Sequence, residues 1–143
     1  MSIQETERIV REYVDALLNR GDFASFFADD VVWTTMETGD QVRGRDAVRD
    51  FIVTMHTQLF DATPELGSMT FADGVAGVEA VFVGTHTAEF AGVPATGAAV
   101  RLPYTVFYDV ADGAIAALRG YLPVSALVQQ LAGADSRRSE PAH

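Results

Sequence analysis

The first part of the chain carries hydrophobic residues at helical spacing. Ser2 and Glu5 have the spacing of a capping box, so a helix is predicted to begin there. Its apolar positions recur every three or four residues: Ile9, Val10, Tyr13, Val14, Leu17 and Leu18. Glycine commonly follows the last turn of a helix, and Gly21 is therefore the predicted stop.

Two more elements are predicted before the pattern changes from helix to strand. A short helix is expected over residues 22–30, with Asp22 as its candidate N-cap. Residues 31–37 are rich in β-branched and aromatic residues, which is typical of a strand. Residues 44–60 return to helical spacing, and their apolar stripe consists of Val48, Phe51, Ile52, Met55 and Leu59.

After Pro64 the chain has the pattern of strands. They are predicted within 65–74, 75–90, 100–113 and 114–122, and Asp-Gly pairs at 73–74 and 112–113 mark hairpin turns. Residues 91–99 contain glycine and proline and read as a connection. A short helix over 125–133 is expected to close a single domain, 1–133, and the polar residues 134–143 are expected to be disordered.

Helices that precede an antiparallel meander predict the α+β class rather than alternating βαβ units. A curved sheet wrapped on helices leaves part of its concave face uncovered. Such a hollow is the default site for a small ligand. We therefore expect an internal pocket.

Composition narrows the class of protein further. The 143 residues suit one domain, and 48% of them are hydrophobic, but no apolar run reaches the ~20 residues that span a bilayer. The formal charge of −10 repels nucleic acid and anionic membranes, so neither is an expected partner. The chain has no cysteine, and its N-terminus is polar and partly acidic rather than a signal peptide, which favours a cytoplasmic location.

Three segments resemble a known family. Residues 26–52 resemble the helix–strand–helix opening of SnoaL-like polyketide cyclases, within the nuclear-transport-factor-2-like superfamily. Residues 84–103 are similar to a stretch of the SnoaL-like and ester-cyclase branch, and 106–123 resemble its final hairpin and that of limonene-epoxide hydrolases. The resemblance implies a cone-shaped α+β barrel with an internal pocket, a homodimer packed through the sheet, and small-molecule chemistry without metal or organic cofactor.

The last predicted strand departs from the family pattern. In the epoxide-hydrolase branch it carries two aspartates, whose places are taken here by Gly120 and Pro123. Epoxide opening needs an acid and a base, so this loss disfavours that reaction and weakens acid–base cyclisation too. Two readings of Gly120 stay open: it widens the pocket, or it forms a bend or bulge in the sheet. Arg119 and Tyr121 should lie on the opposite face by strand alternation.

His86 is the candidate acid–base group, because histidine titrates near neutral pH and this one lies within a strand. The alternative is a satisfied histidine on the outer or dimer face. Tyr104 and Tyr121 are candidate donors to a developing oxyanion, or else interface tyrosines. Strand alternation separates His86 from Glu89 and His56 stands alone on a helix, so no metal site is expected.

The predicted substrate-binding residues come from the first strand, the third helix and the last strand. They are Trp33, Thr35, Glu37, Met55, Leu59, Phe60, Leu118 and Gly120. Each has a plainer reading: Trp33 as a core aromatic, Glu37 as an exposed loop carboxylate, and the apolar residues as core.

The resemblance implies a cofactor-independent cyclase or isomerase. Its substrate would be an apolar polyketide-like or aromatic small molecule, of the kind found in bacterial secondary metabolism. The alternative is a dimeric small-molecule binding protein that has lost its catalytic groups. A scaffold whose cavity is filled by its own side chains is a third reading, and an epoxide hydrolase is disfavoured.

Overall fold

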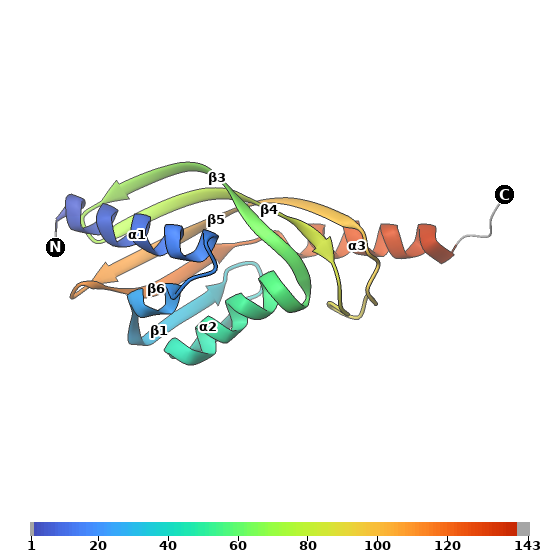
Figure 1. Cartoon of the computed structure of the whole chain (residues 1–143), viewed down its shortest axis with the longest axis horizontal. Coiled ribbons are helices and arrows are strands. Elements are labelled where there is room, and N and C mark those ends of the chain that lie inside the picture. The colour runs from blue at the N-terminus through green and yellow to red at the C-terminus, as the bar shows by residue number, and fades with distance from the viewer. Residues whose placement is uncertain (1, 140–143) are drawn as a thin grey trace.

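The computed structural model describes residues 2–139. In chain order the elements are α1 (Ile3–Leu18), η1 (Phe23–Phe26), β1 (Phe27–Thr35), β2 (Asp40–Arg43), α2 (Arg45–Val53), η2 (Thr54–Gln58), β3 (Phe60–Ala72), β4 (Val75–His86), β5 (Ala99–Ala111), β6 (Ala114–Tyr121) and α3 (Val124–Ser139). Figure 1 shows their arrangement: α1 and α2 lie against the strands, and α3 extends along the long axis toward the C-terminus.

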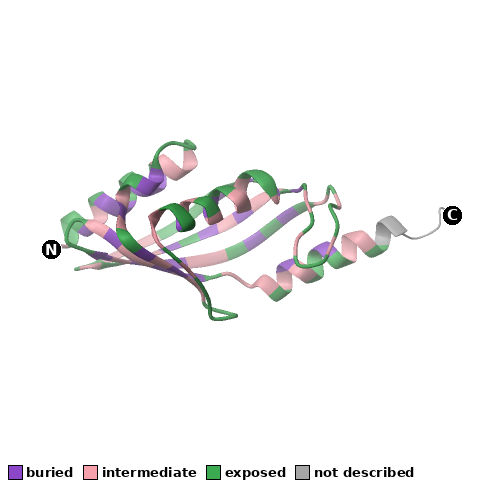
Figure 2. Cartoon of the chain, turned by 90° about the horizontal axis from the view of Figure 1, so that it is seen from below, coloured by how far each residue is buried: buried purple, intermediate pink, exposed green. Residues whose placement is uncertain are grey.

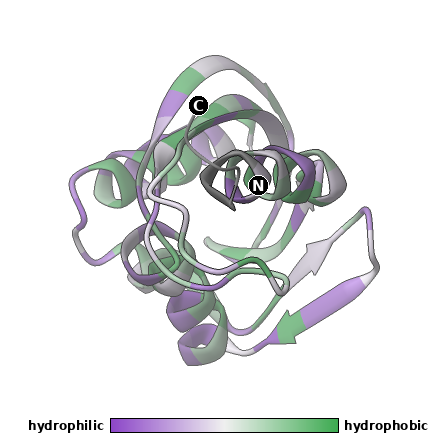
Figure 3. Ribbon diagram, turned by 90° about the vertical axis from the view of Figure 1, so that its right-hand side faces the viewer, coloured by the Kyte–Doolittle hydropathy of each residue, from purple (hydrophilic) through white to green (hydrophobic). Residues whose placement is uncertain are grey.

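The six strands form one open sheet in the order β2-β1-β6-β5-β4-β3. All neighbours pair antiparallel except β1 and β6, which are parallel. The sheet is strongly bent when it is viewed from one end (Figure 3). The fold is thus α+β, as predicted, with helices on a curved and mainly antiparallel sheet, although the sheet does not close into a barrel.

The ends of α1 follow from local sequence. Ser2 is its N-cap, and the Ser2 hydroxyl accepts a hydrogen bond from the Glu5 amide at 3.1 Å, as the capping box predicts. The helix ends one residue earlier than expected, because Arg20 and not Gly21 takes the left-handed conformation, at φ 54°. The Gly21 amide then donates to the Ala16 carbonyl at 2.7 Å, which closes a Schellman turn.

Several predicted boundaries differ from the structure. The short helix over 22–30 is only a single 3₁₀ turn, and Asp22 makes no side-chain cap there. Residues 27–30 instead open β1, because Phe27 pairs with Ile115 of β6, and the register of that pairing shifts before Val32. The short strand β2, which pairs with β1, was not predicted.

The third predicted helix also changes character before it ends. α2 stops at Val53, a π-helical turn follows over Thr54–Gln58, and Phe60 already belongs to β3. β3 therefore begins before Pro64, where the predicted strands began. A proline is tolerated there because β3 is an edge strand, which leaves one side of its backbone unpaired.

The last helix is longer than predicted. α3 passes through Gly133 and continues to Ser139, so residues 134–139 of the expected disordered segment are helical, and 140–143 lie outside the described residues. A glycine inside a helix costs only about 1 kcal/mol relative to alanine. Its neighbours Ala132 and Ala134 are strong helix formers, so the helix continues.

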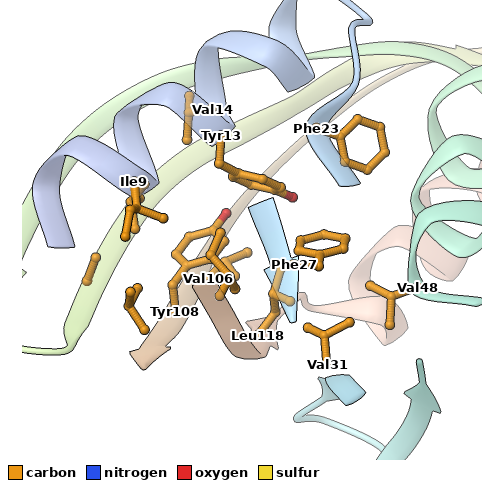
Figure 4. Packing of buried hydrophobic residues seen from close by; sticks show 14 of the residues in the cluster. Ile9, Tyr13, Val14, Phe23, Phe27, Val31, Val48, Val106, Tyr108 and Leu118 are labelled. Atoms are coloured by element: carbon orange, nitrogen blue, oxygen red, sulfur yellow. The ribbon is translucent and has the colours of Figure 1, made fainter. Parts of the chain in front are cut away.

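The concave face of the sheet holds the core. Buried residues alternate with more exposed ones along the strands, as Figure 2 shows. The main cluster joins α1 and α2 to the inner faces of β1, β5 and β6. Figure 4 shows the Tyr13 ring among those of Phe23, Phe27 and Tyr108, which it meets in edge-on and tilted contacts. A second cluster at the other end of the sheet packs Leu127 and Leu131 of α3 on Phe60 and Phe82.

Candidate functional site

A small, mostly apolar cavity of about 60 Å³ lies between the helices and the concave face of the sheet. We call it the inner cavity. Its walls come from α1, α2, η2 and the inner faces of β1, β4, β5 and β6. The lining residues are Tyr13, Leu17, Trp33, Phe51, Ile52, Met55, His56, Phe82, Tyr104, Val106, Tyr108, Leu118 and Leu122.

A second space of about 180 Å³, the outer chamber, adjoins the inner cavity. It opens toward α3 and the 36–39 turn, and Thr35, Phe90 and Leu102 contribute to its walls. Both spaces share the same four side chains as a partition: Phe51, Met55, Phe82 and Leu122. The partition consists only of apolar groups, so movement of these side chains would join the two spaces without breaking a hydrogen bond.

Trp33 fills the space above Gly120. A Cβ atom added to Gly120 would lie 2.4 Å from both Cζ2 and Cη2 of the indole. The indole is fixed by a 2.9 Å hydrogen bond from Nε1 to the Thr35 hydroxyl and by contact with Phe51 at a ring-centroid distance of 5.4 Å. Pairing with β1 and β5 is regular at Gly120, so no bulge occurs there. Gly120 therefore neither bends the sheet nor leaves an open pocket, because the indole of Trp33 packs directly on its backbone.

His56 is the titratable base that the structure places on the inner cavity. Its Nδ1 lies 2.8 Å from the Ile52 carbonyl oxygen, which can only accept a hydrogen bond. Nδ1 therefore carries the proton in the neutral ring, and Nε2, on the far side of the ring, keeps its lone pair. Nε2 is buried without a hydrogen-bond partner among the described residues.

Burial sets the charge of His56. Removal from water lowers its pKa below the usual 6.5, the Ile52 hydrogen bond opposes this, and the nearby Arg20 charge lowers it further. The imidazole is therefore neutral at pH 7. A neutral imidazole with a free lone pair in an apolar cavity can accept a proton from a bound molecule.

Three tyrosines complete the polar side of the cavity. Burial raises the pKa of Tyr104 to about 12, so its hydroxyl is a neutral hydrogen-bond donor at physiological pH. Burial also raises the pKa values of Tyr13 and Tyr108, whose side chains hydrogen-bond each other. Their hydroxyls are visible in Figure 4. Tyr104 has no such side-chain partner among the hydrogen bonds of the described residues, which leaves it the tyrosine best suited to meet a ligand.

His86 lies elsewhere. It is fully buried at the end of β4, where the Thr96 amide donates to its Nδ1 at 3.1 Å, and its Nε2 has no partner among the described residues. Across the sheet Tyr104 pairs with Ala80, six residues before His86, so about 20 Å of strand separates them. His86 faces inward, as one reading held. Its hydrogen bond with Thr96 holds the 87–98 connection against β4. His86 and Tyr104 therefore do not share a site.

The other predicted site residues divide between the cavity and its surroundings. Met55 and Leu118 line the inner cavity with Trp33 and Tyr104, and Thr35 lines the outer chamber. Leu59 and Phe60 pack in the second core cluster. These two follow their plainer reading as core residues.

Glu37 and Tyr121 lie outside the two chambers. Glu37 is an exposed loop carboxylate that accepts a hydrogen bond from the Ser125 amide at 3.2 Å, and hydrogen bonds from Ser125 lower its pKa. It thereby caps the start of α3. Tyr121 is 48% exposed on the convex face, where its ring meets Phe107 at a ring-centroid distance of 5.9 Å. The predicted alternation along β6 is therefore correct, and it separates Tyr121 from the cavity.

A groove of about 710 Å³ lies on the convex side of the sheet. Glu37, Tyr121 and Pro123 border it, and it is open to solvent. We do not assign the chemistry to this groove, because it lacks a buried base and would leave a bound molecule in contact with water. Among residues 2–139, no cluster of three or more metal-ligating side chains occurs, and no helix is long and apolar enough to cross a membrane.

A family model for SnoaL-like polyketide cyclases matches residues 7–131. The chain belongs to this family. Among curated proteins no match is found.

Solved structures share the fold. A proposed polyketide cyclase from Xanthomonas campestris pv. campestris is 24% identical, with a TM-score of 0.77 over 90% of this chain and 98% of that one. A proposed SnoaL-like polyketide cyclase from Jannaschia sp. CCS1 is 16% identical, with a TM-score of 0.77 over 96% and 94%. A proposed ketosteroid isomerase from Kribbella flavida is 23% identical, with a TM-score of 0.67 over 85% and 79%. These similarities establish the fold.

Sequence reasoning missed His56, although a signal for it was present. His56 follows Ile52 by four residues, which places it on the apolar stripe of the predicted helix. A lone histidine on such a stripe is either a satisfied core residue or a group that faces a cavity. The π-helical turn that carries His56 could not be seen in the sequence, and such turns occur often at functional sites.

Proposed function

We propose that this SnoaL-like protein is a cofactor-independent cyclase or isomerase that moves a proton on an apolar carbonyl compound. The observation that carries the proposal is that His56, whose buried Nε2 has no hydrogen-bond partner among the described residues, lines an apolar cavity together with Tyr104. This pair would supply the base and the oxyanion donor, the roles that the sequence pattern gave to His86 and Tyr104.

The proposed reaction begins when Nε2 of His56 removes a proton from the carbon next to the substrate carbonyl. The electron pair of that C–H bond moves onto the carbonyl oxygen, and the Tyr104 hydroxyl donates a hydrogen bond to the enolate. In the isomerisation of a β,γ-unsaturated ketone, His56 returns the proton to the γ-carbon, the C=C bond moves next to the carbonyl group, and the C=O bond re-forms. In a cyclisation the enolate carbon bonds to a second carbonyl carbon of the same molecule, and its oxygen takes up the proton.

Two features of the cavity favour such a step. The apolar walls keep His56 neutral, so the base is available at neutral pH. A confined, apolar space also holds a flexible substrate in a reactive shape, and well-oriented intramolecular reactions reach effective molarities of about 10⁵–10⁸ M. Neither feature requires a carboxylate at position 120 or 123.

The absence of side-chain carboxylates at Gly120 and Pro123 also supports a second candidate, a binding protein without turnover. The two functions differ in one measurable property. An enzyme of the proposed class exchanges the α-hydrogens of a bound ketone with solvent, whereas a carrier binds the ketone without exchange.

The test is deuterium exchange into phenylacetone in D₂O, followed by NMR for the wild type, His56→Gln and His86→Gln. Glutamine keeps polarity but accepts no proton at neutral pH, and both histidines are largely buried, so the two variants are matched. We expect at least a 10²-fold loss of exchange in His56→Gln, the usual contribution of a general base, and less than a threefold change in His86→Gln. Wild-type exchange no faster than in buffer would overturn the proposal, and loss only in His86→Gln would transfer the role to His86.

We also propose a homodimer packed through the convex face of the sheet. Phe107 and Tyr121 are exposed there beside the ion pair of Arg119 with Asp109, and Arg101 pairs with Glu65 nearby. A face that presents aromatic rings together with both signs of charge can pair with its own copy about a twofold axis.

A further inference from the structure

The inner cavity is too small for the ligand class that the family resemblance implies. Its volume is about 60 Å³, whereas an apolar cavity that binds benzene has a volume of about 150 Å³. The outer chamber, at about 180 Å³, has room for one aromatic ring. Since His56 lines the inner cavity and not the outer chamber, a molecule whose ring lies in the outer chamber has to extend into the inner cavity to reach His56.

Trp33 determines how wide the inner part of that path is. Its indole lines the inner cavity, and the benzo edge sits on Gly120. The ring cannot move toward the strand, because backbone lies directly beneath it. It is also held at its other end by the Thr35 hydroxyl. The indole is therefore a fixed wall, whereas Met55 and Leu122 of the partition are flexible aliphatic side chains.

We infer that Trp33 is the specificity-determining residue of the site, and that it restricts the substrate to a single ring or short apolar chain bearing a slender carbonyl arm. The ring lies in the outer chamber, and the arm passes the partition of Phe51, Met55, Phe82 and Leu122 into the inner cavity. Fused-ring carbonyl compounds are excluded, because their second ring would occupy the volume of the indole. This inference names the substrate class of the function proposed above and rests on it.

Phenylacetone and 2-tetralone form a matched pair of probes. Both carry an aromatic ring, a benzylic methylene and a ketone, but in 2-tetralone the carbonyl arm is closed into a second ring. We would measure the dissociation constants of both ketones by ligand-observed NMR, for the wild type and for Trp33→Ala. The wild type should bind phenylacetone at least tenfold more tightly than 2-tetralone.

Removal of the indole should reduce that preference to less than threefold, chiefly through tighter binding of 2-tetralone. Trp33→Leu is the second variant should Trp33→Ala fail to fold, and far-UV circular dichroism checks both. Phe71→Ala is the control, because Phe71 packs under the Arg11 guanidinium and lines neither the inner cavity nor the outer chamber. It should leave the tenfold preference in place.

Three results would overturn the inference: equal binding of the two ketones by the wild type, a preference that persists without the indole, or no binding of either ketone to any variant. The outcome is separable from that of the proposed function. Selective binding without deuterium exchange would remove the catalytic proposal and keep the size restriction. Exchange without selectivity would do the reverse.

Discussion

The contact between Trp33 and Gly120 gives the sharpest prediction for stability. In Gly120→Ala the new methyl group would lie 2.4 Å from two indole carbons and 3.0 Å from Cδ1 of Leu122. Ordinary van der Waals contact begins near 3.4 Å, so the indole has to move by about 1 Å. The Thr35 hydrogen bond and the Phe51 ring resist that movement.

Overpacking of this kind costs typically about 1–3 kcal/mol, and we expect Gly120→Ala to lose that amount of unfolding free energy. For a chain of 143 residues this corresponds to a Tm lower by roughly 3–5 °C per kcal/mol. The backbone itself does not require glycine here, because Gly120 is not among the residues with positive φ. Without the indole, the same substitution should instead be neutral or stabilise by up to about 1 kcal/mol, as glycine-to-alanine changes do at compatible sites.

The assay is urea unfolding followed by far-UV circular dichroism. It would be applied to the wild type, Gly120→Ala, Trp33→Leu and the double variant. Circular dichroism is needed because Trp33 is the only tryptophan and two of the proteins lack it. The expected result is a double-mutant coupling of at least about 1 kcal/mol. An equal loss of stability from Gly120→Ala in both backgrounds would refute the reasoning, since the cost would then not come from the indole.

Three further predictions follow from the structure. Because burial lowers the pKa of His56 below 6.5, deuterium exchange should persist down to pH 6.5 and fall at lower pH. The unfolded chain binds a proton at His56 more readily than the folded protein does. Acid should therefore destabilise the wild type more than His56→Gln, which urea titrations at pH 7 and pH 5 would measure. Thr6→Val should cost about 1–3 kcal/mol in urea unfolding, because the buried hydroxyl accepts from the Gly74 amide at 2.9 Å; Thr6→Ser should restore most of it, and an unchanged midpoint for the valine variant would show that water replaces the bond. Tyr121→Asp should shift the protein to monomer in light scattering, because it places charge on the convex face, yet change exchange less than threefold; a cavity role for Tyr121 would instead abolish exchange.

Much of the architecture could be predicted because it depends on local patterns. The capping box at Ser2 and Glu5 and the Asp-Gly turns act over three or four residues, and each appears where it was expected. The boundaries that differed depend on partners distant in sequence. Pro64 belongs to a strand only because that strand lies at the sheet edge, and Phe27 begins β1 because β6 pairs beside it.

For the site, the sequence by itself determined the types of residue available and which residues of a strand share a face. Alternation along β6 places Leu118 and Gly120 on one face and Arg119 and Tyr121 on the other. The sequence could not determine which inward groups meet. Register and sheet curvature decide that, and both arise from packing across the whole chain.

The two histidines show the difference. His86 lies on the inner face, as its strand allowed, but strand register places it about 20 Å from Tyr104. His56 stood alone in the sequence, yet a π-helical turn packed on the bent sheet places it on the same cavity as Tyr104. The sequence thus determined that an α+β domain with an apolar core would form, with few acid–base groups inside it. Only tertiary packing decided that His56, and not His86, would line the inner cavity with Tyr104, and that Trp33 would fill the space above Gly120.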